Sequence, residues 1–298
     1  MKCAKVISVC FIPKKKIEKT YLLGEPLGFF GHSQKSDNPK ENIKNIEFLI
    51  DYENKYSPGV ERDLIIVNND IGNLEGNNFL KKISEKKINK GKIICLNRDN
   101  IGRSFGAFSY AFSKFRSKYD YYLFAEDDIL VFGENYFIKG IDIFNSNKKA
   151  GFLAYIGKTK VGKWRWKELN LNKDTAYSCH GATGLTSSIV LEKIFKIYNN
   201  LPHHKGSDRE LDITYGEVGF PSSIIKLGYE IMDLPKNLIL AIPLYDEIRG
   251  IKYKKFPNLI ERTIYYLKKY IYDIFSGNKF TLKLYLKFLK IIKSWVKF

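Results

Sequence analysis

The run of residues 92–137, KIICLNRDNIGRSFGAFSYAFSKFRSKYDYYLFAEDDILVFGENYF, constrains the fold of this chain more than any other stretch. It opens with the apolar residues 93–96 and passes through a polar turn that contains glycine. Apolar residues at helical spacing follow, and residues 121–125 then form a nearly continuous apolar run, as a strand buried on both faces does. This order of strand, turn, helix and strand predicts a βαβ unit of an open α/β sheet.

Three consecutive carboxylates, Glu126, Asp127 and Asp128, end the second apolar run. In open α/β sheets the carboxyl ends of the strands are where ligands bind. Adjacent acids are costly to hold together unless a positive charge lies among them. Hard Mg²⁺ or Mn²⁺ prefers carboxylate oxygen and often arrives bound to phosphates. A solvated acidic turn between two strands is the alternative that these residues alone leave open.

This stretch resembles the GT-A glycosyltransferases, especially the family-2-like bacterial enzymes. Their pattern is an Asn-x-Gly turn, a helix, a strand ending in aromatic or aliphatic residues, and an Asp-x-Asp-type metal motif. The corresponding parts here are Asn100-Ile101-Gly102, residues 121–124, and Glu126-Asp127-Asp128 with Glu in first place. The resemblance implies an α/β fold with a GT-A, Rossmann-like mixed sheet flanked by helices. In that fold Asp128 and Glu126 would hold Mn²⁺ or Mg²⁺, and Asp127 would lie beside a nucleotide-diphosphate sugar.

The turn after the predicted third strand would complete the nucleotide-sugar side of the site. Asn100 and Gly102 form the Asn-x-Gly turn, in which glycine lets the backbone approach a ligand closely or adopt a positive φ. Arg98 and Arg103 flank the turn, and both are suited to meet a diphosphate as bidentate donors. Exposure to solvent is the alternative for each arginine.

Residues 63–67 (DLIIV) predict another strand, which ends at Asn69 and Asp70. Family-2-like enzymes commonly carry an acid at this strand end, where it contacts the base or the ribose. The resemblance therefore makes Asp70 the first candidate for nucleotide binding and Asn69 the second. An Asx turn that caps the loop is the alternative. The loop after the first predicted strand is long and unlike that of the family, so the remaining base contacts stay unassigned.

Glu217 takes the place of the catalytic carboxylate in the resembled enzymes, just before a helical segment that ends near residue 227. It would act as general base in an inverting reaction. The Asp that usually follows this acid is replaced by Val218. Three nearby acids are rivals for the role: Asp208, Glu210 and Asp212.

Four further residues are candidates for the acceptor side. Trp164 and Trp166 alternate as on a strand, and tryptophan faces stack on sugar rings, although ordinary packing is the alternative. His180 and Gly181 belong to a small, glycine-rich segment that faces donor and acceptor in the resembled enzymes. His180 could also be a structural histidine.

The remaining pattern completes a predicted domain of residues 1–250. Strands are expected at residues 6–12 and 151–156, and helices at residues 42–56, 79–88 and 136–144 and from residue 189. The four cysteines are scattered and form no CxxC pair, which favours reduced thiols in a cytoplasmic protein. Residues 6–12 are too short for the apolar part of a signal peptide.

Positive charge is concentrated in a predicted tail of residues 251–298. From Arg249 onward thirteen Lys and Arg residues stand against two acids, which accounts for +11 of the net charge of +18. Residues 259–275 and 280–298 predict two helices, and the lysines of the second recur at helical period. A basic amphipathic extension of this kind is expected to bind the anionic inner face of the cell membrane peripherally. A helix packed on the domain with solvated lysines is the alternative.

The sequence thus predicts a metal-dependent, hexosyltransferase-type glycosyltransferase that uses a nucleotide-diphosphate sugar and a glycan or lipid-linked acceptor. A lipid-linked acceptor suits assembly of bacterial surface polysaccharide or lipooligosaccharide. A catalytically inactive GT-A-like binding or scaffold subunit remains an alternative from a different class. A sugar nucleotidyltransferase is also α/β and metal-dependent, but no GxGxR-type loop follows the first strand. Nucleic acid is not expected as a partner, because no known nucleic-acid motif is present.

Overall fold

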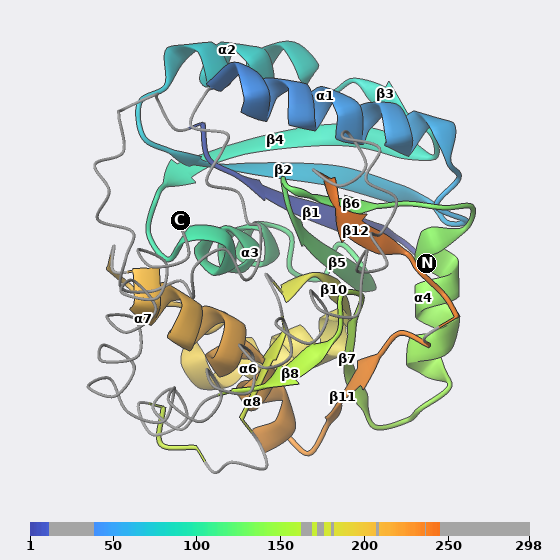
Figure 1. The fold of residues 1–298 in the computed structure, drawn as a ribbon, viewed down its shortest axis with the longest axis vertical. Coiled ribbons are helices and arrows are strands. Elements are labelled where there is room, and N and C mark those ends of the chain that lie inside the picture. The colour runs from blue at the N-terminus through green and yellow to red at the C-terminus, as the bar shows by residue number, and fades with distance from the viewer. Residues whose placement is uncertain are drawn as a thin grey trace, which may run out of the picture.

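The computed structural model describes residues 1–11, 39–161, 169–171, 176–179, 182–206, 209–235 and 237–244. These residues form an α/β fold in which helices flank a mixed eight-stranded sheet (Figure 1). Across the sheet the strands are, in order, β11 (Glu230–Asp233), β7 (Ala150–Ala154), β10 (Gly184–Ser187), β5 (Tyr121–Glu126), β1 (Cys3–Val9), β2 (Arg62–Asp70), β4 (Gly91–Asp99) and β3 (Lys87–Ile88). Two small sheets pair β6 (Ile129–Val131) with β12 (Ala241–Pro243) and β8 (Lys158–Lys160) with β9 (Tyr177–Cys179).

The four central strands β4, β2, β1 and β5 run parallel, so their carboxyl ends lie along one edge of the sheet. The register pairs Ser8 of β1 with Glu126 of β5, and Asn69 of β2 with Arg98 of β4. β10 runs antiparallel between β5 and β7. The polar residues that the sequence places at strand ends therefore come from neighbouring strands at one edge.

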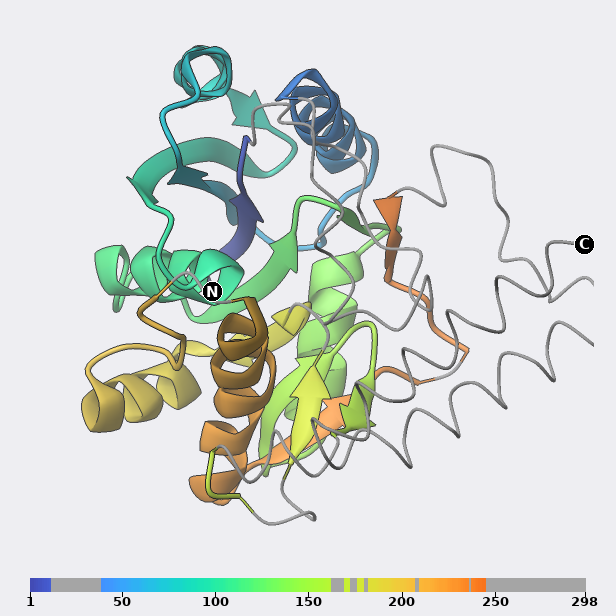
Figure 2. The same ribbon diagram turned by 60° about the vertical axis from the view of Figure 1, so that its left-hand side comes forward.

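Helices cover both faces of the sheet because side chains alternate between the faces along each buried strand. Val6 belongs to the core beneath α3 (Arg103–Lys114), α6 (Ser188–Tyr198) and α8 (Gly219–Lys226). Ile7 belongs to the core beneath α1 (Pro39–Lys55) and α2 (Leu74–Ile83). On that second face α4 (Tyr136–Asn145) packs over β5 and β7. Figure 2 shows α1 and α2 on the side of the sheet opposite to α3.

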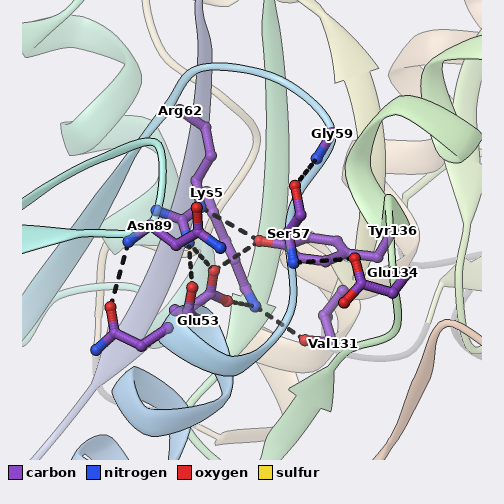
Figure 3. Close-up of polar contacts among 10 residues, drawn as sticks. Lys5, Glu53, Ser57, Gly59, Arg62, Asn89, Val131, Glu134 and Tyr136 are labelled. Atoms are coloured by element: carbon purple, nitrogen blue, oxygen red, sulfur yellow. Dashed lines mark hydrogen bonds and ion pairs between the residues drawn. The ribbon is translucent and has the colours of Figure 1, made fainter.

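A fully buried ionic network fastens α1 and α4 to the sheet (Figure 3). Glu53 of α1 pairs with Lys5 of β1 at 2.5 Å and with Arg62 at the start of β2. The hydroxyl of Tyr136 donates to Glu53 at 2.7 Å and accepts from the Arg62 Nε at 3.3 Å. Lys5 also donates to the carbonyl of Val131 at 3.3 Å. The network joins four elements through one carboxylate.

The predicted helices and strands occur in the predicted order within the described residues, but one helix has other bounds and several strands were not predicted, among them β6, β11 and β12. The predicted helix at residues 79–88 begins earlier, at Leu74, because the side chain of Asn73 caps it by accepting from the Gly76 N–H at 2.9 Å. It ends at Ile83, and residues 87–88 form the edge strand β3. The glycine-rich segment at 179–188, where no strand was predicted, contains β10. Gly184 is needed there, because a Cβ would lie 2.3 Å from the Leu153 carbonyl oxygen of β7.

The acceptor-side candidates Trp164, Trp166, His180 and Gly181 lie outside the described residues. The predicted domain boundary at residues 250–251 and the basic tail lie outside them too. Among the helices that the structure describes, none is long and apolar enough to cross a membrane.

Candidate functional site

The acidic loop Glu126-Asp127-Asp128 follows β5 at the carboxyl edge of the sheet and is held by four other parts of the chain. The Asp127 N–H donates to the Ser8 carbonyl at 3.1 Å, and the Leu244 N–H donates to the Asp128 carbonyl at 2.7 Å. Two side chains bind the carboxylates of this loop: Ser104 of α3 donates to Glu126 at 2.5 Å, and Asn42 of α1 donates to Asp127 at 3.0 Å. The loop is a built feature of the fold rather than a solvated turn.

The middle acid of this loop, Asp127, has a strongly perturbed pKa. Burial, and after it the charges of Asp128 and Glu126, raise the pKa of Asp127 to about 8, against the lowering effect of the hydrogen bond from Asn42. Two like charges this close disfavour each other's ionised form. A bound cation would reverse both effects, because it favours the charged carboxylate.

The donor set at this loop fits a hard divalent cation. Its side-chain atoms are carboxylate oxygens, which Mg²⁺ and Mn²⁺ prefer. In the part of the chain that the structure describes, no three His, Cys, Asp or Glu side chains converge as a complete metal site. Mg²⁺ is commonly bound through one or two carboxylates, with waters and substrate phosphates completing its shell. The loop therefore suits a metal that arrives with a phosphate ligand.

At the end of β2, Asp70 and Asn69 lie in different environments. Asp70 accepts from the Gly72 N–H at 2.8 Å, which makes the Asx turn, and from Asn77 at 3.0 Å. Asn69 is 2% exposed; its amide nitrogen donates to the Ser8 hydroxyl at 3.0 Å, and its oxygen accepts from Arg98 at 2.5 Å. Both polar atoms of Asn69 therefore bind neighbouring strands.

The Asn-x-Gly turn lies between β4 and α3, and its glycine has a structural reason. Gly102 adopts a φ of +68°, and a Cβ there would lie 2.5 Å from the Cδ2 of His203. Arg98 does not point to solvent as a free donor, since it also donates to the Ile101 carbonyl at 2.5 Å and so holds the turn. The guanidinium of Arg103, by contrast, is half-exposed beside Asp212.

Cys10, directly after β1, lies close to candidate residues from several strand ends. The Asn100 amide lies 3.9 Å from its Sγ. Burial, and after it the charges of Asp127 and Asp70, raise the pKa of Cys10 to about 11, against the lowering effect of Arg103. The structure thus brings the strand-end candidates around the end of β1. Sequence reasoning missed Cys10, Asn42 and Ser104, whose positions give no periodic or motif signal.

Glu217 does not belong to the strand ends of the sheet. It lies in the π-helical segment η2 (Thr214–Val218), between α7 (Arg209–Ile213) and α8. It is half-buried and accepts from the Ser178 hydroxyl of β9 at 3.1 Å. The η2 segment packs closely on α3: a Cβ on Gly216 would lie 2.3 Å from the ring of Phe105. Single π-helical turns occur frequently at functional sites.

No protein-family model matches the chain, and no curated protein matches its sequence. Among solved structures, TarS from S. aureus matches with 12% identity and a TM-score of 0.38, over 79% of this chain and 35% of that one. A cytidylyltransferase from Leptospira borgpetersenii matches with 12% identity and a TM-score of 0.40, over 91% and 94%. A 4-diphosphocytidyl-2C-methyl-D-erythritol synthase from Anaerococcus prevotii matches with 10% identity and a TM-score of 0.38, over 78% and 86%.

The chain spans about a third of the length of the TarS chain, as the 35% coverage states. All three likenesses are distant, with TM-scores below 0.5, and they decide neither the fold family nor the activity. The function is therefore inferred from the residues and contacts of the site.

Proposed function

We propose that this protein is a metal-dependent glycosyltransferase that moves a sugar from a nucleotide-diphosphate donor to a hydroxyl of a glycan or lipid-linked acceptor. One observation supports the proposal above the others: three adjacent acids are built into the carboxyl edge of the sheet, where Ser104 and Asn42 hold two of them and the pKa of Asp127 is raised to about 8. A carboxyl with a strongly perturbed pKa at the ligand-binding edge of an α/β sheet is a candidate for a functional residue.

The donor would lie along the carboxyl ends of the central strands. Asp128 and Glu126 would hold Mn²⁺ or Mg²⁺, which when bound would neutralise charge on the departing nucleotide diphosphate. The residues proposed for the nucleotide-sugar side are Asp70, Asn69, Asn100, Gly102, Arg103 and Asp127. Because both polar atoms of Asn69 bind neighbouring strands, it would act by holding Asp70 and the turn in place.

Glu217 would act as general base. It would take the proton of the acceptor hydroxyl as that oxygen forms a bond to the anomeric carbon and the bond from that carbon to the diphosphate oxygen breaks. A single displacement of this kind inverts the anomeric centre. The hydrogen bond from Ser178 would fix the orientation of the Glu217 carboxylate. Trp164, Trp166, His180 and Gly181 are proposed for the acceptor side, and the basic tail for docking to an anionic membrane surface where a lipid-linked acceptor lies.

The test is a titration with nucleoside diphosphates, with and without Mn²⁺, read as a shift in melting temperature. A ligand at a hundredfold excess over its Kd stabilises the folded state by about 2.7 kcal/mol, which is readily measured. We expect a metal-dependent shift for one nucleoside diphosphate in the wild type and none in Asp128→Ala. Asp120→Ala is the matched control, because this exposed acid lies at the amino end of the same strand.

The other outcomes separate the alternatives. A metal-dependent shift with nucleoside triphosphates and sugar 1-phosphates, but not with diphosphates, would point to a nucleotidyltransferase. A folded protein that responds to no nucleotide would contradict the enzyme proposal and favour a binding or scaffold subunit.

A further inference from the structure

An ion pair joins Arg103, the first residue of α3, to Asp212 of α7. The Nε of Arg103 lies 2.8 Å from the Oδ2 of Asp212. The Asp212 side chain is 4% exposed, whereas that of Arg103 is 48% exposed. Figure 1 shows α7 next to the beginning of α3. A buried carboxylate therefore faces a guanidinium whose outer part remains in solvent.

The geometry of this pair differs from that of an ordinary two-pronged Arg–carboxylate pair. At the other end of α3, Arg116 donates to Glu192 through Nε at 3.0 Å and through a terminal nitrogen at 2.6 Å, so the carboxylate occupies one edge of the guanidinium. In Arg103 the closest approach of the acid is to Nε, on the stem side. In the described part of the chain the two terminal nitrogens of Arg103 make no hydrogen bond, so a planar fork of donors is left open.

The residues on either side of Arg103 fix the start of α3 and tie it to the acidic loop. Gly102, directly before it, lies in the left-handed conformation against His203, which fixes where the helix starts. Ser104, directly after it, donates to Glu126 of the loop at 2.5 Å. Arg103 is therefore held between a fixed turn and a fixed contact with the proposed metal-binding acids.

We infer that Asp212 is a positioning residue that orients Arg103, so that the two terminal nitrogens of the guanidinium receive the diphosphate of the donor. The inference rests on the proposed function and adds the residue that aims the diphosphate contact. A guanidinium matches phosphate geometry bidentately, and a partner that holds it in place beforehand reduces the ordering cost of binding. Asp212 was a rival of Glu217 as general base; its pairing with Arg103 gives it this different role.

The test measures the Kd of inorganic pyrophosphate and of the nucleoside diphosphates, with Mn²⁺, by calorimetry. We expect Asp212→Asn to weaken pyrophosphate binding about three- to tenfold, the cost of one unfixed long side chain. Arg103→Ala should weaken it about tenfold or more, because a charged hydrogen-bonding partner is lost. Arg103→Lys should also weaken it, since a lysine keeps the charge without the fork.

A double variant separates positioning from a general structural effect. If Asp212 acts through Arg103, Asp212→Asn should leave the pyrophosphate Kd unchanged when Arg103→Ala is already present. Glu192→Gln is the matched control: it breaks the Arg116 pair at the other end of α3 and should leave the Kd as in the wild type. Urea unfolding of each variant shows whether the protein is folded.

Several results would overturn the inference. Asp212→Asn could bind pyrophosphate as the wild type does, or it could lose the same factor with and without Arg103. If Asp212→Asn does not fold, Arg103→Lys decides, and pyrophosphate binding equal to that of the wild type would overturn the inference. A wild type that binds neither pyrophosphate nor any nucleotide would overturn the proposed function as well.

Discussion

Two carboxylate sites lie beside the same strand, β1: the buried Glu53 and the half-buried acidic loop. The fold treats their charges in opposite ways. At one, Glu53 is surrounded by Lys5, Arg62 and the Tyr136 hydroxyl. Burial alone would raise the pKa of Glu53, but the charges of Arg62 and Lys5 outweigh it and hold that pKa below its ordinary value. At the other, the acidic loop is bound by an amide and a hydroxyl, and the pKa of Asp127 is raised to about 8.

The two sites differ in how neighbouring groups match the carboxylate charge. A buried charge that serves only the fold is matched within the fold, since an unmatched one costs several kcal/mol. The Glu53 network meets that condition with three partners of its own. At the acidic loop the contacts to Glu126 and Asp127 come from neutral groups, the Ser104 hydroxyl and the Asn42 amide, and the pKa of Asp127 is raised. Under the proposed function, the loop gives up stability for binding. The comparison agrees with a structural role for the Glu53 network and with the function proposed for the acidic loop.

Removing the carboxylate of the network should give the largest effect. Glu53→Ala leaves Lys5 and Arg62 buried without their partner, so we expect a loss of about 3–5 kcal/mol in the free energy of unfolding. Urea denaturation measures it. Glu47→Ala is the control, because Glu47 is exposed on the same helix. A loss for Glu53→Ala no larger than that of the control would remove the network from the account of stability.

Lowering the pH should also weaken the Glu53 network. The loss in the free energy of unfolding should be smaller than for Glu53→Ala, because protonation leaves the Glu53 side chain in place. The folded pKa of Glu53 is depressed, so the unfolded chain binds its proton first as the pH falls. The stabilisation is complete above the ordinary pKa of 4.5 and is lost as the pH drops through the folded value. Unfolding free energies measured from pH 7 to pH 3 should converge for wild type and Glu53→Gln. A constant difference across that range would contradict this assignment.

The acidic loop was predictable from sequence, but the network was not. Residues 121–128 carry a local signal, since a buried strand ends abruptly in three acids. Lys5 lies inside an apolar strand, and its partner Glu53 is 48 positions away on a helix, so only the packed fold brings them together. Asn42 reaches Asp127 over 85 positions for the same reason. Periodicity predicts which face of an element is buried, and it cannot predict which polar side chains meet across elements.

Neutralising an acid of the acidic loop should raise the free energy of unfolding, whereas removing Glu53 should lower it. In Asp127→Asn the new side-chain oxygen can still accept from Asn42, while a carboxyl whose raised pKa costs the folded state stability is replaced by a group that does not ionise. We expect the metal-free protein to gain on the order of 1 kcal/mol in unfolding free energy, together with a loss of the metal-dependent nucleotide shift. Asp99→Asn, an exposed acid at the same edge of the sheet, should change neither quantity. Destabilisation by Asp127→Asn would mean that the loop is built for the fold and not for a ligand.

The smallest change in stability is expected at an exposed ion pair, which also separates the effect of burial from that of distance. Lys92 and Glu85 approach to 2.5 Å, the same distance as Lys5 and Glu53, but their side chains are 42% and 63% exposed instead of 0% and 1%. Water screens such a pair, and holding two long side chains together costs entropy, so the pair contributes little. Glu85→Gln should therefore leave the urea midpoint indistinguishable from that of the wild type, at low and at high salt. A midpoint shift as large as that of Glu53→Gln would mean that distance, not burial, sets the value of an ion pair here, and the contrast between the two sites on β1 would lose its basis.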